Sequence, residues 1–232
     1  MREHGAVAGD LLLLSNSRPP GGAAPFAHAR AELDAHLGDR ELWFVPYARA
    51  DHDDYTAWVA HALGREVRGV HRAPDPAAAL HTARAVMVGG GNTFRLLATA
   101  RRLGLLEPLR AVERYVGSSA GTNLAGPTIR TTNDMPIVEP GGLDALGLVP
   151  FQINPHYLDP DPTSTHQGET RAERIAEFHE ENATPVLGLR EGAWLHRADR
   201  TLSLGGNTAR LFRRGREPLE LAPGADLSWL TA

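Results

Sequence analysis

Short apolar runs alternate with segments of helical period through the first half of the chain, and this alternation limits the fold more than any other feature. Five runs have the length and composition of buried strands: Leu11–Leu14, Leu42–Val45, Val67–Val70, Ala85–Val88 and Tyr115–Gly117. Four segments between them carry apolar residues at helical spacing: Phe26–Leu37, Asp54–Leu63, Pro76–Thr82 and Asn92–Arg102. Such alternation predicts a parallel sheet with both faces covered by helices.

The pattern changes after Pro150. Phe151–Asn154 has the character of a strand that leads into a loop rich in Pro, Asp and Thr. A charged helix over Glu169–Glu181 and three short strands follow, at Val186–Leu189, Ala193–His196 and Thr201–Leu204. We expect this C-terminal third to complete a mixed sheet. Because the chain has no repeat and no long linker, we predict one domain over residues 11–232, preceded by an extension, residues 1–10.

Two residue types are missing from the chain, and their absence excludes several classes of enzyme. Without cysteine there is no disulfide, no thiolate nucleophile and no Cys-based metal site. Without lysine there is no Walker lysine, no pyridoxal Schiff base and no Ser-Lys dyad. The 24 cationic residues are therefore all arginine. They are scattered and the net charge is −4, so we expect no nucleic-acid partner.

The N-terminal segment is polar, and the apolar run behind it, Leu11–Leu14, is too short for a signal-peptide core or a membrane span. We therefore expect a cytoplasmic protein with no membrane partner. One acidic cluster, Asp51-His52-Asp53-Asp54, has the composition of a metal site. It also opens a predicted helix, where acidic side chains cap the first turn, and we favour this capping role and predict no metal.

Gly117-Ser118-Ser119-Ala120-Gly121 has the pattern of a nucleophile elbow, a sharp strand-to-helix turn that exposes its central serine. The segment follows a predicted strand and precedes a segment compatible with a helix, so Ser119 is at the apex and Ser118 is not. A Gly-Ser turn without catalytic function is the alternative in a chain with 24 glycines. The assignment therefore depends on finding a base and an acid.

A serine hydroxyl needs a general base, which is usually a histidine oriented by a carboxylate. Most of the eleven histidines, His36 and His179 among them, occur in predicted helices, where we expect them to be solvated. His156 instead follows a strand end, where parallel sheets place functional loops. Asp134, in a polar turn before Pro136, is the predicted orienting acid. If Asp134 does not orient the base, Glu169 and Glu191 are the alternatives.

An acyl-transfer site also needs backbone donors for the developing oxyanion. Gly89-Gly90-Gly91-Asn92 follows an apolar strand and opens a helix, so its N–H groups can face an anion. A phosphate loop is excluded by the absence of lysine, and a dinucleotide motif by Phe94. We predict that the N–H groups of Gly91 and Ala120 form the oxyanion hole.

Six segments resemble the peptidase E family of α-aspartyl dipeptidases, which are serine peptidases related to cyanophycinase. They are LLLLSNS (11–17), VGGGNTF (88–94), G-x-SAG-x-NLAGPTIRTTNDMPIV (117–138), DALGL-x-P-x-QINPH (144–156), GETR (168–171) and LGGNT (204–208). The resemblance implies a three-layer α/β/α sandwich with a mostly parallel central sheet, similar to class I glutamine amidotransferases. It also implies a catalytic triad of Ser119, His156 and Asp134.

The resemblance implies a small peptide substrate with an N-terminal aspartate and no cofactor. The sequence leaves the oligomeric state open, with a homodimer as one possibility. An aspartyl side chain in a partly desolvated pocket needs a cation, which must be arginine here. Arg171 is our first choice and Arg130 the second. Glu169 is a candidate for the substrate's free α-amine, and Asn92 is a further candidate binding residue. Two alternatives are a hydrolase for β-aspartyl or cyanophycin-like amides and a non-catalytic protein that binds small anions.

Overall fold

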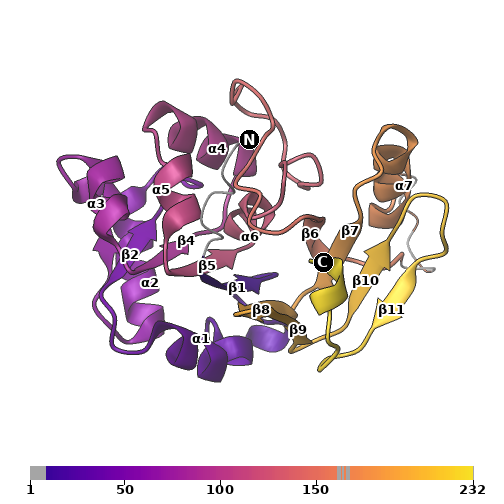
Figure 1. Cartoon of the computed structure of the whole chain (residues 1–232), viewed down its shortest axis with the longest axis horizontal. Coiled ribbons are helices and arrows are strands. Elements are labelled where there is room, and N and C mark those ends of the chain that lie inside the picture. Colours follow the sequence, from indigo (N-terminus) through magenta and orange to yellow (C-terminus); the bar gives the residue numbers. More distant parts are fainter. Residues whose placement is uncertain (1–8, 161–162, 164, 166–167, 232) are drawn as a thin grey trace.

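The computed structural model describes residues 9–160, 163, 165 and 168–231, which form two sheets and the helices around them (Figure 1). The larger sheet has the strand order β3-β2-β4-β5-β1-β8-β9. These strands are β1 (Asp10–Leu14), β2 (Leu42–Val45), β3 (Arg68–Gly69), β4 (Ala85–Val88), β5 (Arg114–Ser118), β8 (Trp194–Ala198) and β9 (Thr201–Gly205). The first five pair in parallel, whereas β8 and β9 are antiparallel. The five strands predicted in the first half are confirmed, with β3 shortened to two residues.

Helices cover both faces of the large sheet (Figure 1). One face packs against α1 (Arg30–Leu37) and α2 (His52–Leu63), and the other against α3 (Pro76–Thr82), α4 (Thr93–Arg102), α5 (Leu106–Ala111) and α6 (Ala120–Leu124). Strand β1 is apolar at Leu11–Leu14 because both of its faces are buried. Leu12 and Leu14 pack in the core on one side of the sheet, and Leu11 and Leu13 pack in the core on the other side. The predicted three-layer α/β/α arrangement is confirmed.

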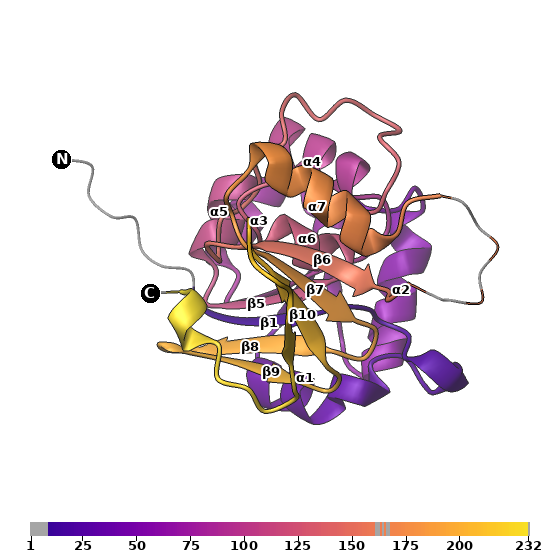
Figure 2. The ribbon, with the colours of Figure 1, turned by 90° about the vertical axis from the view of Figure 1, so that its right-hand side faces the viewer.

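A second sheet, which the sequence did not predict, has the strand order β11-β10-β7-β6. Its strands are β6 (Gln152–Tyr157), β7 (Val186–Arg190), β10 (Ala209–Phe212) and β11 (Leu219–Leu221), and Figure 2 turns them toward the viewer. The parallel strands β6 and β7 are joined through α7 (Arg171–Glu181), which packs on this sheet through Ile175. The prediction that the C-terminal third completes one mixed sheet is therefore right only for β8 and β9. Strands β6 and β7 belong to the second sheet instead, because that sheet packs against α7 in a separate hydrophobic core.

The acidic cluster at the start of α2 caps that helix, as predicted. The Asp51 carboxylate accepts a hydrogen bond of 2.9 Å from the backbone N–H of Asp54. Asp53 is engaged by His71 and Arg72, each at 2.7 Å. Among the described residues, no group of three or more acidic or histidine side chains is arranged to hold a metal ion. Within the same residues, no helix has the length and apolar character needed to cross a membrane.

His36 and His179 are buried, so the expectation that they are solvated is wrong. The side chain of His36 is only 3% exposed because α1 turns it toward the sheet. There its ring meets that of His196 on β8 edge-on, with 5.6 Å between the ring centroids. Burial, followed by the neighbouring charge of His196, lowers the pKa of His36 to about 4.

We expect acid to destabilise the fold through His36. Its pKa lies below the value of about 6.5 in the unfolded chain, so the unfolded state binds the extra proton as pH falls. The contribution is complete above pH 6.5 and declines toward pH 4, and the pKa difference corresponds to about 3 kcal/mol. Urea unfolding of the His36→Phe variant should show a smaller loss of stability over this range. A change equal to that of a His81→Gln control, in which an exposed histidine is replaced, would contradict the role of His36.

Candidate active site

Ser119 lies at the apex of a sharp turn between β5 and α6, at the carboxyl end of a parallel strand. Its backbone is in a left-handed region rare for residues other than glycine, with φ of 51° and ψ of −106°. A Cβ atom on Gly117 would come within 2.7 Å of the Gly121 carbonyl oxygen, and one on Gly121 within 2.2 Å of the Val88 carbonyl oxygen. Close packing therefore requires glycine at both positions, which explains why Gly117 and Gly121 flank the serine in the elbow motif.

His156 is brought to the serine by a bulge at the end of β6. Its Nε2 atom lies 3.0 Å from the Ser119 hydroxyl oxygen. The residue has a positive φ of 53°, and the pairing of β6 with β7 shifts register beside it. Its backbone N–H donates to the Ser15 hydroxyl oxygen at 2.9 Å, and that hydroxyl donates to the Leu189 carbonyl at 2.9 Å. Ser15 thus fixes the unusual backbone that turns the imidazole toward Ser119.

Glu191, at the end of β7, holds the other side of the imidazole. Its Oε1 atom lies 2.8 Å from Nδ1 of His156. Two asparagines fix the turn that carries it: Asn16 accepts from the Gly192 N–H at 2.8 Å, and Asn207 donates to the Glu191 carbonyl at 2.9 Å. This geometry corrects the prediction that Asp134 orients His156, because both ring nitrogens are engaged by other groups.

Asp134 is directed to the start of α4 instead. Its Oδ2 atom accepts from the backbone N–H of Thr93 at 2.8 Å, from the Thr93 hydroxyl at 2.5 Å and from the Thr132 hydroxyl at 3.1 Å. The first N–H groups of a helix have no partner within the helix, so a nearby carboxylate is held there strongly. The local polar turn that suggested an orienting acid is thus explained by the capping of α4.

A cavity of about 350 Å³ joins these groups. Ser119, Ala120, His156, Asp134 and Arg171 all line it. Four further polar residues in its wall were not predicted: Thr93, Asn123, Thr132 and Asn133. Each occurs in a segment that carries the family resemblance, which is the only signal that could have marked them. The cavity therefore contains a candidate nucleophile, its base and two opposite charges.

Arg171 is the one predicted specificity arginine that reaches the cavity. It begins α7, whose N-terminus is closed by a capping box of Thr170 and Glu173. Burial, and then the charge of Arg174, lowers the pKa of Arg171, while Asp134 acts in the opposite direction. Within the part of the chain that the structure describes, Arg171 forms no ion pair, so its guanidinium is available to a ligand.

The other predicted binding residues lie outside the wall of this cavity. Arg130 is exposed to solvent, and Glu169 pairs with Arg174 at 3.5 Å. Asn92 has a structural role, because its side chain accepts from the Arg95 N–H at 3.0 Å and donates to the Met135 carbonyl at 2.8 Å. The structure therefore does not support a binding role for these three side chains in this cavity.

The two predicted oxyanion donors differ in position. Ala120 begins α6 and lines the cavity, whereas Gly91 is not part of its wall. Gly90 is the glycine that packs against the serine, since a Cβ atom there would lie 3.1 Å from Cβ of Ser119. The Gly90 N–H donates to the Tyr55 hydroxyl at 2.8 Å. The oxyanion hole remains a prediction, with Ala120 the better placed donor.

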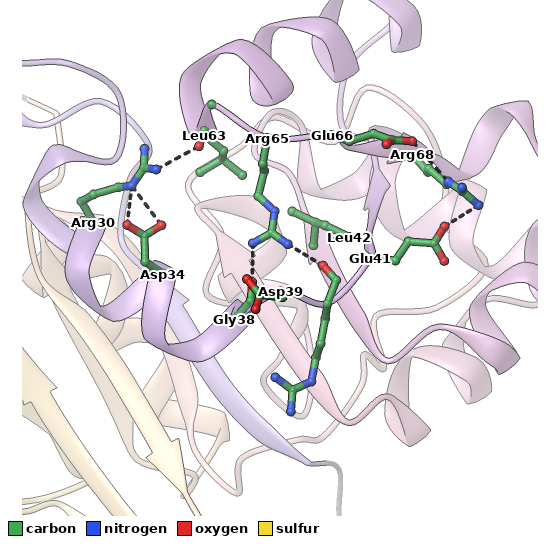
Figure 3. A pocket seen from close by; sticks show the side chains of 12 residues that line it. Arg30, Asp34, Gly38, Asp39, Glu41, Leu42, Leu63, Arg65, Glu66 and Arg68 are labelled. Carbon is green, nitrogen blue, oxygen red and sulfur yellow. Dashed lines mark hydrogen bonds and ion pairs between the residues drawn. The ribbon is translucent and has the colours of Figure 1, made fainter.

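A larger cavity of about 510 Å³ lies at the opposite end of the parallel strands, near the start of β2 and the C-terminal ends of α1 and α2 (Figure 3). Its arginines are engaged by protein groups: Arg30 pairs with Asp34, Arg68 pairs with Glu41, and Arg65 donates to backbone carbonyls. These charges compensate one another, and none of the described residues that line this cavity is a nucleophile. The cavity at Ser119, which holds the Ser119–His156 pair, is therefore the candidate active site.

Comparison with known proteins identifies the family. The sequence model of peptidase family S51 matches residues 11–205. The chain belongs to peptidase family S51. Peptidase E of Streptomyces coelicolor is 59% identical over 230 residues, which cover 95% of this chain and 94% of that protein. The probable alpha-aspartyl dipeptidase of Drosophila melanogaster is 48% identical over 237 residues, which cover 97% of this chain and 98% of that protein. The predicted resemblance to peptidase E is therefore confirmed.

Two solved structures share the fold of this chain. A peptidase from an acI-B1 actinobacterium has a TM-score of 0.61 at 16% identity, covering 95% of this chain and 96% of that one. A putative peptidase E protein from Listeria monocytogenes EGD-e has a TM-score of 0.58 at 22% identity, covering 92% and 98%. At such identities the likeness concerns the fold alone.

Proposed function

We propose that this S51 protein is a serine dipeptidase that hydrolyses dipeptides with an N-terminal aspartate through an acyl-enzyme intermediate. The observation that carries the proposal is the hydrogen-bonded series of Glu191, His156 and Ser119, with contacts of 2.8 Å and 3.0 Å at the wall of a cavity. The name of the Drosophila relative, an alpha-aspartyl dipeptidase at 48% identity, supports the same substrate class.

In the first step, the Ser119 hydroxyl oxygen attacks the carbonyl carbon of the aspartyl residue. Nε2 of His156 takes the hydroxyl proton, and Glu191 accepts a hydrogen bond from Nδ1–H. This bond selects the tautomer whose Nε2 is free to act as a base, and it stabilises the imidazolium that forms. Glu191 therefore has the role that sequence reasoning gave to Asp134.

The tetrahedral oxyanion needs donors, for which we retain the N–H groups of Ala120 and Gly91. As the intermediate collapses, His156 returns the proton to the leaving amine and the peptide bond breaks. Water then attacks the acyl-enzyme with His156 again as the base, and free aspartate leaves. Each step uses only water and groups of this chain, and none draws on a metal or an organic cofactor.

Selectivity for aspartate is assigned to Arg171. Its guanidinium lies in the wall of the cavity with Ser119 and has no ion-pair partner among the described residues. A planar guanidinium can donate two parallel hydrogen bonds to a carboxylate, so it suits the β-carboxylate of a bound aspartyl residue. A neutral or longer side chain would leave this cation desolvated or badly matched.

We expect Arg171→Met to lose activity for aspartyl substrates selectively. The measurement is kcat/KM for Asp-, Glu-, Asn- and Leu-p-nitroanilide. Because Arg171 is partly exposed, the loss for Asp should lie near the lower end of the range for breaking a charge pair, about 2 kcal/mol or about 30-fold. Arg130→Met, which removes an exposed arginine outside the cavity, is the matched control. An equal loss on all four substrates would give Arg171 a structural role.

A further inference from the structure

The end of β6, which carries His156, has few backbone contacts that tie it to β7. In the described part of the chain, β6 is an edge strand and pairs with β7 alone. Pro155 has no backbone N–H to donate, and the N–H of His156 donates to the Ser15 hydroxyl instead. The register then shifts before Tyr157 pairs with Arg190. The two strands therefore need another connection beyond the bulge.

An ion pair between Arg190, on β7, and Asp159, shortly after the end of β6, supplies this connection. The guanidinium donates from Nε to Oδ2 at 2.6 Å and from Nη2 to Oδ1 at 2.9 Å. Two parallel hydrogen bonds between a guanidinium and a carboxylate fix the direction of both groups as well as their distance. Because Arg190 is the last residue of β7, it is followed directly by Glu191, whose carboxylate holds the imidazole of His156. The ion pair thus joins the two strands directly beside that contact.

The guanidinium of Arg190 is itself held in place, and its side chain is only 17% exposed. It lies over the ring of Tyr157, 5.5 Å from the centroid, and that ring packs against Phe212 in the core under α7. The hydrogen bond to Asp159 raises the pKa of Arg190 against the effect of burial, and the same bond lowers the pKa of Asp159. An isolated exposed ion pair contributes little, but a bidentate pair on a packed base can fix geometry.

A second acid, Glu220 on β11, binds the same guanidinium. Its oxygens accept from Nη1 of Arg190 at 2.9 Å and from Nη2 at 3.1 Å. The side chains of Asp159 and Glu220 are similarly exposed, at 45% and 54%. They differ in position, because Asp159 extends from the strand that carries His156, whereas β11 is at the other edge of the sheet. Loss of either acid takes two hydrogen bonds from Arg190, but only the loss of Asp159 releases β6.

We propose that the ion pair of Arg190 and Asp159 positions the imidazole of His156 against Glu191. This inference rests on the series of Ser119, His156 and Glu191 in the proposed function. Neither Arg190 nor Asp159 belongs to the described lining of the cavity at Ser119, so both act through the geometry of the base and its acid. They are positioning residues that do not contact the substrate.

The test compares Asp159→Ala with its matched control, Glu220→Ala, on Asp-p-nitroanilide. Asp159→Ala should lower kcat about 10-fold, because the aligned arrangement of His156 would then be only about 10% populated. KM should stay near the wild-type value, since the cavity is unchanged. Glu220→Ala should keep kcat within about twofold of wild type, as expected for loss of a half-exposed ion pair. Equal decreases in kcat for both variants, or no decrease for Asp159→Ala, would overturn the inference and leave the network as a stabiliser of the sheet.

A double-mutant cycle with Glu191→Gln shows whether the ion pair acts through the imidazole contact. In the Glu191→Gln background, Asp159→Ala should change kcat by less than about threefold, because the contact that it protects is already lost. If Asp159→Ala again lowers kcat by about 10-fold in that background, the two residues act independently and the inference is overturned.

Crystal structures of wild type and Asp159→Ala separate this inference from the proposed function, because they need no catalysis. Wild type should show the contact of 2.8 Å between Nδ1 of His156 and Glu191. In the variant the same two groups should lie mostly beyond hydrogen-bond distance, at more than about 3.5 Å. If wild type hydrolyses no aspartyl substrate, the proposed function fails, and this comparison alone decides the role of Asp159. An unchanged contact in the variant would overturn that role.

Discussion

Replacement of Ser119 by alanine is expected to lower the rate of Asp-Leu hydrolysis by about 10⁶-fold, as loss of the nucleophile does in other catalytic triads. Only Ser119 presents its hydroxyl to the imidazole, at 3.0 Å. Ser118→Ala should retain most of the wild-type activity. The Ser118 side chain points into the protein, where it is 1% exposed and its oxygen has no hydrogen-bond partner in the described structure.

Covalent labelling tests the same two variants, Ser119→Ala and Ser118→Ala, by an independent measurement. A fluorophosphonate should modify wild type and Ser118→Ala at Ser119, as mapped by peptide mass spectrometry, and should leave Ser119→Ala unmodified. Circular dichroism confirms that each variant is folded. Equal losses of activity in both variants, or labelling of Ser118, would remove Ser119 from its role as nucleophile.

Glu191→Gln is expected to give the second largest effect, a decrease in kcat of up to about 10⁴-fold. The carboxylate accepts from Nδ1–H, whereas the glutamine amide can also donate to Nδ1. Donation would favour the tautomer protonated at Nε2, which cannot take the Ser119 proton. Because the Glu191 side chain is 46% exposed, water can partly replace it, and the measured decrease is expected to be smaller than for a fully buried acid.

Asp134→Asn is the matched comparison, since it makes the same change in the acid that sequence reasoning preferred. Its decrease in kcat on Asp-Leu should be much smaller than that of Glu191→Gln, because both ring nitrogens of His156 are engaged by other groups. A large decrease in kcat for Asp134→Asn, together with a small one for Glu191→Gln, would restore Asp134 as the orienting acid.

The sequence predicts the first half of the fold well because its signals are local. Runs such as Leu11–Leu14 are apolar at every position, as strands buried on both faces must be. Elements with weak local signals were not predicted. Helix α5 contains Pro108 and is only six residues long, and β11 has two exposed residues out of three. The second sheet depends on how β6, β7 and α7 pack together, which no short pattern encodes.

The candidate site divides in the same way. Ser119 is marked by its elbow, and His156 by its position at a strand end, so both are found from local sequence. Glu191 lies 35 residues beyond His156, and the two meet because β6 and β7 are parallel neighbours. Asp134 carries a clear polar signal, but that signal arises from capping α4 and lining the cavity. The tertiary fold therefore decides which acid pairs with His156, whereas local sequence is enough to indicate the candidate nucleophile and base.

Chromatographic separation of the products from α-Asp-Leu and β-Asp-Leu tests the proposed activity most directly. Folded wild-type protein should release aspartate and leucine from α-Asp-Leu and leave β-Asp-Leu intact, because in the proposed function Arg171 binds the aspartyl side chain and the carbonyl next to the free α-amine lies at Ser119. Faster hydrolysis of β-Asp-Leu, or no hydrolysis of α-Asp-Leu by the folded protein, would contradict its assignment as an α-aspartyl dipeptidase.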